Sequence, residues 1–187
     1  MSKNRTANKL FNRALETLEN VDLIREEKGL NKEVKEGYSF IANDLKEALL
    51  FGKDNAAYIL AYLHCEGYGV KKDIEKAKLW IAIGNEVGNA NCAKLMRGED
   101  PGGSIDVFKY INKNSVFSKG ILEKATAYAK SVKVYTDFIR SVDAEIPDVT
   151  LLAAINLFDN AEPSHTLNIL GDDAPVGNGG GGICVIL

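Results

Sequence analysis

The sequence has few of the residues that mark secreted, metal-binding or membrane-spanning proteins. Only three cysteines occur among 187 residues, and the wide spacing of Cys65, Cys92 and Cys184 forms neither a disulfide framework nor a zinc motif. No run approaches the roughly 18 apolar residues of a transmembrane helix. The N-terminus carries charges throughout and lacks the apolar stretch of a secretory signal. The composition therefore predicts a protein of the reducing cytosol without a metal site.

Positive charge is missing from the end of the chain. No Lys or Arg follows Arg140, and the acidic residues beyond it leave the first 140 residues with a net charge of about +4, against −3 for the whole chain. These acidic residues are Asp143, Glu145, Asp148, Asp159, Glu162, Asp172 and Asp173. No Lys/Arg cluster argues for a nucleic-acid partner. The charge pattern predicts a mildly basic body followed by an acidic segment.

Strand signals are absent, and apolar residues recur at helical spacing. Neither alternating runs nor hairpin dipeptides occur. One helical stripe contains Leu10, Phe11, Ala14, Leu15, Leu18 and Val21; a second contains Val34, Tyr38, Ile41, Ala42, Leu45, Ala48 and Leu49. A third helix is expected at about residues 54–65, with Ala57, Leu60, Ala61 and His64 on its apolar face. The fold class predicted is all-α.

An internal repeat relates two of the predicted helices. A shift of 36 residues lays Gly52 on Gly88, Asn55 on Asn91, Ala57 on Ala93 and Leu60 on Met96. Small residues fall on small ones, and large apolar residues on large apolar ones. Stacked helical hairpins need this pattern, because close helix crossings admit only small side chains at the contact.

Eight residues in the third predicted helix, the turn after it and the next helix follow one another in a specific order. They are Ala57, Leu60, Gly67, Gly69, Asp73, Ala77, Trp80 and Gly88. In this order they resemble the Sel-one-like repeat, a relative of the tetratricopeptide repeat, best over residues 53–88. The resemblance implies an α-solenoid-like helix-turn-helix array over residues 5–97 that makes protein–protein contacts. Ala61, His64 and Gly84-Asn85 depart from the family pattern.

The individual positions suit these roles. Gly67 and Gly69 allow the inter-helix turn, and Asp73 is expected to cap the second helix. Ala77 and Trp80 of this second helix are expected to pack against the first helix of the hairpin.

Two further regions follow the repeat. The turn-rich break at residues 98–103 precedes a C-terminal helical region at 104–161. In it we expect a short helix from Ser104 or Asp106 through Ile111, a longer one from about Ile121 to Val142, and one after Pro147. The apolar residues of the last are Leu151, Leu152, Ile155, Leu157 and Phe158. Residues 162–187 are rich in glycine and polar residues and predict a disordered tail.

The tail ends in Cys184-Val185-Ile186-Leu187, which matches the Cys-aliphatic-aliphatic-X signal for prenylation. Leu187 at the last position favours geranylgeranyl, and the glycines at 179–182 give an extended lead-in to a transferase site. We expect a eukaryotic prenyltransferase to modify Cys184 and so to tether the protein to the cytoplasmic face of a membrane. The alternative is an unmodified apolar end that docks on the body.

No catalytic constellation is evident. His64 and Cys65 are adjacent, but neighbours on a helix point about 100° apart. Cys92 occupies a small-residue position, His165 lies in the predicted tail, and the glycine run opens no helix. We therefore expect an adaptor for an unidentified protein partner, not an enzyme, and no cofactor.

The combination of such repeats with a prenylation ending resembles secreted effectors of intracellular bacteria, which implies action at a host membrane. A soluble scaffold without lipid and an unrecognised enzyme domain at residues 104–160 are the alternatives.

Overall fold

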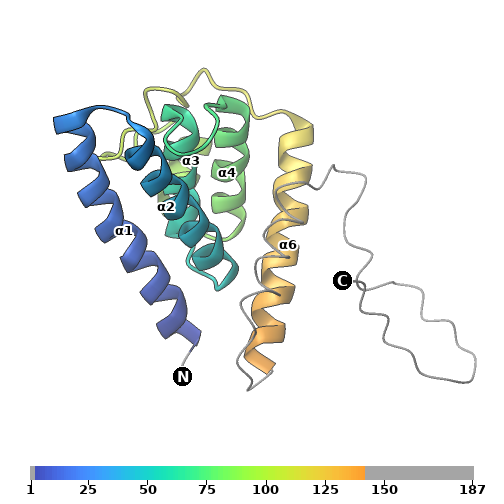
Figure 1. Cartoon of the computed structure of the whole chain (residues 1–187). Helices are drawn as coiled ribbons and strands as arrows, with labels where there is room; N and C mark the ends of the chain where they lie inside the picture. Colours follow the sequence, from blue (N-terminus) through green and yellow to red (C-terminus); the bar gives the residue numbers. More distant parts are fainter. Residues whose placement is uncertain (1–2, 142–187) are drawn as a thin grey trace, which may run out of the picture.

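Six helices follow one another in the computed structural model, which describes residues 3–141, with side chains from residue 6 to residue 134 (Figure 1). They are α1 (Lys3–Lys28), α2 (Lys32–Leu50), α3 (Asn55–Glu66), α4 (Ile74–Glu86), α5 (Ala90–Met96) and α6 (Lys119–Ser141). No strand occurs in that range, so the prediction of an all-α fold is confirmed. No helix in it is long and apolar enough to cross a membrane.

The first four helices, α1 to α4, run in alternating directions and form hairpins (Figure 1). α1 packs on α2, α2 on α3 and α3 on α4, while α4 also contacts α5 and α6. Seen in Figure 1, α1 and α6 form the two edges of this arrangement and α3 and α4 lie between them. Within residues 3–141, α1 and α6 are therefore the edge helices, and α2, α3 and α4 lie between them.

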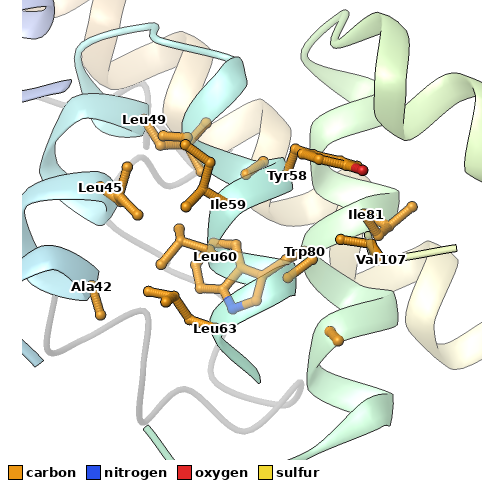
Figure 2. Close-up of a cluster of buried hydrophobic side chains, with 14 of the residues drawn as sticks. Ala42, Leu45, Leu49, Tyr58, Ile59, Leu60, Leu63, Trp80, Ile81 and Val107 are labelled. Carbon is orange, nitrogen blue, oxygen red and sulfur yellow. The ribbon is translucent and has the colours of Figure 1, made fainter. Parts of the chain in front are cut away.

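The inner helix α3 is buried around most of its circumference. Its buried residues are Ala56, Ala57, Tyr58, Ile59, Leu60, Ala61, Leu63, His64 and Cys65. The sequence pattern predicts one apolar face, whereas the structure covers α3 by α2, α4 and α5. Figure 2 shows this centre, where Leu60 and Leu63 of α3 lie between Leu45 of α2 and Trp80 of α4.

Polar side chains fix three helix beginnings. The side-chain oxygens of Asn31, Asp73 and Asn89 each accept a hydrogen bond of 2.9 Å from the backbone N–H three residues later. Each bond satisfies a donor that the first turn of a helix leaves unpaired. The beginnings of α2, α4 and α5 are therefore set by the local sequence.

The 36-residue spacing reappears in the helix ends. α2 ends at Leu50 and α4 at Glu86, and Gly52 and Gly88 follow at the same distance with φ of 88° and 95°. Each glycine precedes a further helix, α3 or α5. Equivalent turns thus occur at equivalent places, although α5 with seven residues is shorter than α3 with twelve.

The prediction of a short helix ending at Ile111 is wrong. Residues 104–111 contain only a single turn, in which Ile111 N–H donates to the Val107 carbonyl at 3.0 Å. Gly102 and Gly103 precede it with positive φ, and Asn112 follows and accepts from Asn114 N–H at 3.0 Å. These local turns on both sides stop the helix from propagating.

The predicted repeat region, residues 5–97, and the described part of the predicted C-terminal helical region, from residue 104, share a hydrophobic core. Val107 and Ile111 are fully buried in the same hydrophobic cluster as α3 and α4, and Ile121 and Ala125 of α6 also belong to this cluster. The break at residues 98–103 therefore separates two stretches of sequence that pack on one another.

Candidate functional site

Four of the predicted repeat residues lie in the core. Ala57, Leu60 and Ala77 are completely buried, and Trp80 is 4% exposed. The Trp80 ring meets the ring of Tyr128 edge to face, with centroids 5.7 Å apart. Because Tyr128 belongs to α6, Trp80 joins the α3–α4 hairpin to the edge helix and is not available to a ligand.

The other four repeat residues shape the turns. Gly67 ends α3 in the left-handed conformation with φ of 78°, and Asp73 caps α4. A Cβ at Gly69 would overlap the backbone of Tyr38 and Ser39 in α2. The Ser39 hydroxyl donates to the Gly69 carbonyl at 2.6 Å, so the turn between α3 and α4 is seated on α2. Gly88 has open space around it.

A further glycine, Gly84, lies where three helices approach one another closely. A Cβ there would overlap Sγ of Cys92 and lie 3.1 Å from Cβ of Ala57. In the sequence, Gly84 is only a departure from the family pattern. Its spacing from Ala57 and Cys92, both at small-residue positions, was the available signal.

A tyrosine–arginine cluster connects the two hairpins, and the sequence does not reveal it. The cluster is Asp22, Arg25, Tyr38, Tyr62 and Tyr68. The Tyr38 hydroxyl donates to the Asp22 carboxylate, and the Arg25 guanidinium donates to the Tyr68 hydroxyl. The rings of Tyr38 and Tyr68 stack at 4.7 Å, and Tyr62 meets Tyr68 edge to face at 5.9 Å.

Two phenols of this cluster have raised pKa values. Burial raises the pKa of Tyr38 and raises that of Tyr62 to about 12, so both phenols stay protonated at neutral pH. Arg25 also lies 4.7 Å above the Tyr68 ring. Charge-assisted bonds and ring contacts therefore hold α1, α2, α3 and the following turn together.

A second polar contact fixes α1 on α2. The Arg13 guanidinium donates two hydrogen bonds of 2.6 Å to the two carboxylate oxygens of Asp44, whose side chain is 5% exposed. Arg13 also lies 5.1 Å from the centre of the Phe40 ring.

The side chains with nucleophilic or basic chemistry are enclosed. Burial raises the pKa of the Cys65 thiol to about 12 and also raises that of Cys92. The His64 Nδ1 lies 3.2 Å from the Lys71 carbonyl, and burial lowers the pKa of its imidazole. Within the described residues no group of three His, Cys, Asp or Glu side chains could hold a metal ion. Cys65 and His64 are therefore buried side chains that pack within the body of the protein.

The surface is hollowed beside α6. A hollow of about 430 Å³ lies where the ends of α2 and α4 meet α6, lined by apolar Leu49, Val87 and Val132 and by charged Asp54, Glu86, Lys130 and Lys133. This hollow therefore lies beside the edge helix α6.

The predicted lipidation site, Cys184 with Val185, Ile186 and Leu187, lies outside the described residues, and so does the predicted helix after Pro147. Comparisons with known proteins find no matching family, no matching curated protein and no matching solved structure.

Proposed function

We propose that this chain is a membrane-tethered protein–protein interaction adaptor that carries a geranylgeranyl group on Cys184. The observation that carries the proposal is the sequence Cys184-Val185-Ile186-Leu187 behind four glycines. In a chain that ends at Leu187, this is the signal that protein prenyltransferases modify. The lipid forms a thioether at Cys184, and the protein is the substrate of that reaction.

The helical body supports an adaptor role. Its thiols at Cys65 and Cys92 are buried, and burial raises their pKa values, so neither presents a thiolate to solvent. Helical hairpins joined side by side offer extended surfaces that suit protein partners. The resemblance to effectors of intracellular bacteria favours a host cell membrane as the place of action.

Two variants test the lipid anchor. The chain carries an N-terminal tag and is expressed in eukaryotic cells beside Cys184→Ser, and the C-terminal peptide of each is analysed by mass spectrometry. We expect a geranylgeranyl mass on Cys184 and a membrane fraction that the serine variant loses. Leu187→Ser is the matched control, since serine at the last position directs farnesyl and should change the lipid mass without abolishing modification.

The acidic segment favours a second candidate, a soluble scaffold without lipid. One lipid chain gives reversible attachment, and stable anchoring usually needs a basic patch or a second acylated cysteine. The residues after Arg140 contain no Lys or Arg, and Cys184 is their only cysteine. If Cys184 is unmodified and the unchanged protein fractionates like the Cys184→Ser variant, the result favours the scaffold over the tethered adaptor.

A further inference from the structure

The two edges of the helical arrangement carry different surfaces. α1 exposes a charged and polar face that includes Lys9, Asn12, Glu16 and Glu19. α6 exposes what we call its outer face: Lys119, Leu122, Glu123, Thr126, Ala127, Lys130, Ser131 and Val134. The outer face lies opposite the buried residues Ile121, Ala125 and Val132 of the same helix.

The outer face has the composition of a helix contact. Leu122 and Val134 are 39% and 50% exposed, and Thr126, Ala127 and Ser131 between them are small. Small residues let another helix approach closely, as they do at Ala57, Gly84 and Cys92 inside the body. A terminal helix of an array normally turns a polar face to water, as α1 does. The outer face of α6 therefore combines exposed apolar and small residues with the charged Lys119, Glu123 and Lys130.

Charge indicates the occupant. Lys124, Lys130 and Lys133 of α6 are exposed and form no ion pair within the described residues. The residues directly after α6 carry the opposite charge, with Asp143, Glu145, Asp148 and Asp159 and no Lys or Arg. An acidic segment beside a basic helix is attracted to it, most strongly at low ionic strength.

The short stretch between α6 and the next predicted helix indicates how the two would pack. Five residues, 142–146, lie between Ser141, the last described residue of α6, and Pro147, which suits the first turn of a helix. Leu151, Leu152, Ile155 and Phe158 then follow at helical spacing. Connections of two to eight residues join helices that pack as antiparallel neighbours.

From these observations we propose that residues 147–160 pack antiparallel against the outer face of α6 and complete the helical array. A helix of that length is about 21 Å long and reaches back along α6 to about Ala127. Its apolar residues then cover Val134 and the small residues Ala127 and Ser131. Asp159, near the end of that helix, comes close to Lys130 and Lys133.

Cysteine cross-linking tests this packing in the full chain. Ser131→Cys and Ile155→Cys are introduced together into a Cys184→Ser chain, where the remaining cysteines, Cys65 and Cys92, are buried. A short thiol cross-linker should join the pair within one molecule. The product keeps the monomer mass, and its yield stays the same on dilution, because the two thiols are linked by the chain itself.

Two controls separate the packing from chance encounters. Asn12→Cys with Ile155→Cys should give little product, since Asn12 lies on α1 at the other edge (Figure 1). Lys130→Glu with Lys133→Glu, added to the Ser131–Ile155 pair, should lower the rate of cross-linking, whereas Lys9→Glu should not.

The result that overturns the proposal is equal cross-linking from Ser131 and Asn12, or none from either. A product of dimer mass whose yield falls on dilution also overturns it and assigns the outer face to a second copy. The packing is independent of the lipid anchor, because Cys184 is absent from every chain in this test.

Discussion

At the scale of single residues, Gly84 shows how strictly the inner helices are packed. A Cβ at this position would overlap Sγ of Cys92. Alanine favours a helix over glycine by about 1 kcal/mol, but overpacking a close crossing costs about 1–3 kcal/mol. We expect Gly84→Ala to lower the free energy of unfolding measured in urea.

Two variants isolate the steric cause at Gly84. Gly120→Ala, in α6, meets nothing within 4 Å and should be neutral or slightly stabilising. Cys92→Ala removes the overlapping sulfur, so the double variant should lose less than the sum of the single losses. Additive losses would contradict the packing explanation.

His64 makes the stability of the protein depend on pH. The Lys71 carbonyl can only accept, so Nδ1 carries the hydrogen, and the buried Nε2 has no hydrogen-bond partner among the described residues. Burial lowers the pKa of His64 below its usual 6.5. Just below pH 6.5, the imidazole is therefore protonated in the unfolded chain but remains neutral in the native protein.

The contribution of His64 is therefore fully present above about pH 6.5 and falls as the pH drops below that value, by at most about 1.4 kcal/mol per pH unit. Urea unfolding at pH 7.5, 6.5 and 5.5 measures the slope. His64→Leu should flatten it over this range, whereas replacing the other histidine, His165→Asn, should leave it unchanged. A slope that survives in His64→Leu would point to another group.

At the scale of helices, Arg13 and Asp44 hold the edge helix α1 on α2. The Asp44 side chain is almost fully buried, and Arg13 supplies two hydrogen bonds to it. Arg13→Met keeps the apolar stem but leaves a buried carboxylate unpaired, which costs about 1–3 kcal/mol.

Arg97→Met is the control for Arg13, because Arg97 pairs with Glu99 at an exposed site and its loss should change stability little. Thermal unfolding of both variants compares the two pairs. Equal losses would mean that burial of Asp44 does not determine the strength of the pair.

The sequence predicts helices well where periodicity and caps agree. The stripe from Leu10 to Val21 and the capping residue Asp73 lead directly to α1 and α4, because both signals lie within a few residues. It predicts poorly what depends on tertiary contact. Burial around α3 comes from helices on several sides, and the tyrosine–arginine cluster joins residues as far apart as Arg25 and Tyr68.

The turn at residues 104–111 also shows that local spacing alone does not predict a helix. Val107 and Ile111 have helical spacing, yet both are buried by long-range packing on α3 and α4 while the local backbone makes a single turn. Helical spacing of two apolar residues therefore identified a core contact and not a helix.

At the scale of the whole molecule, the described helices share one hydrophobic cluster that runs from Leu10 in α1 to Ala125 in α6. A shared core favours a single cooperative unfolding transition. Trp80, the only tryptophan, reports on it well, because it is buried between the α3–α4 hairpin and Tyr128 of α6.

We therefore expect tryptophan fluorescence, which follows the contact between α4 and α6, and far-UV circular dichroism, which follows all helices, to give the same urea midpoint. Tyr128→Leu keeps an apolar side chain but removes the ring contact, and it should lower both midpoints together. If fluorescence changed at lower urea while the helical signal remained, α6 would detach before the hairpins unfold. The break at residues 98–103 would then separate two units of stability despite their common core.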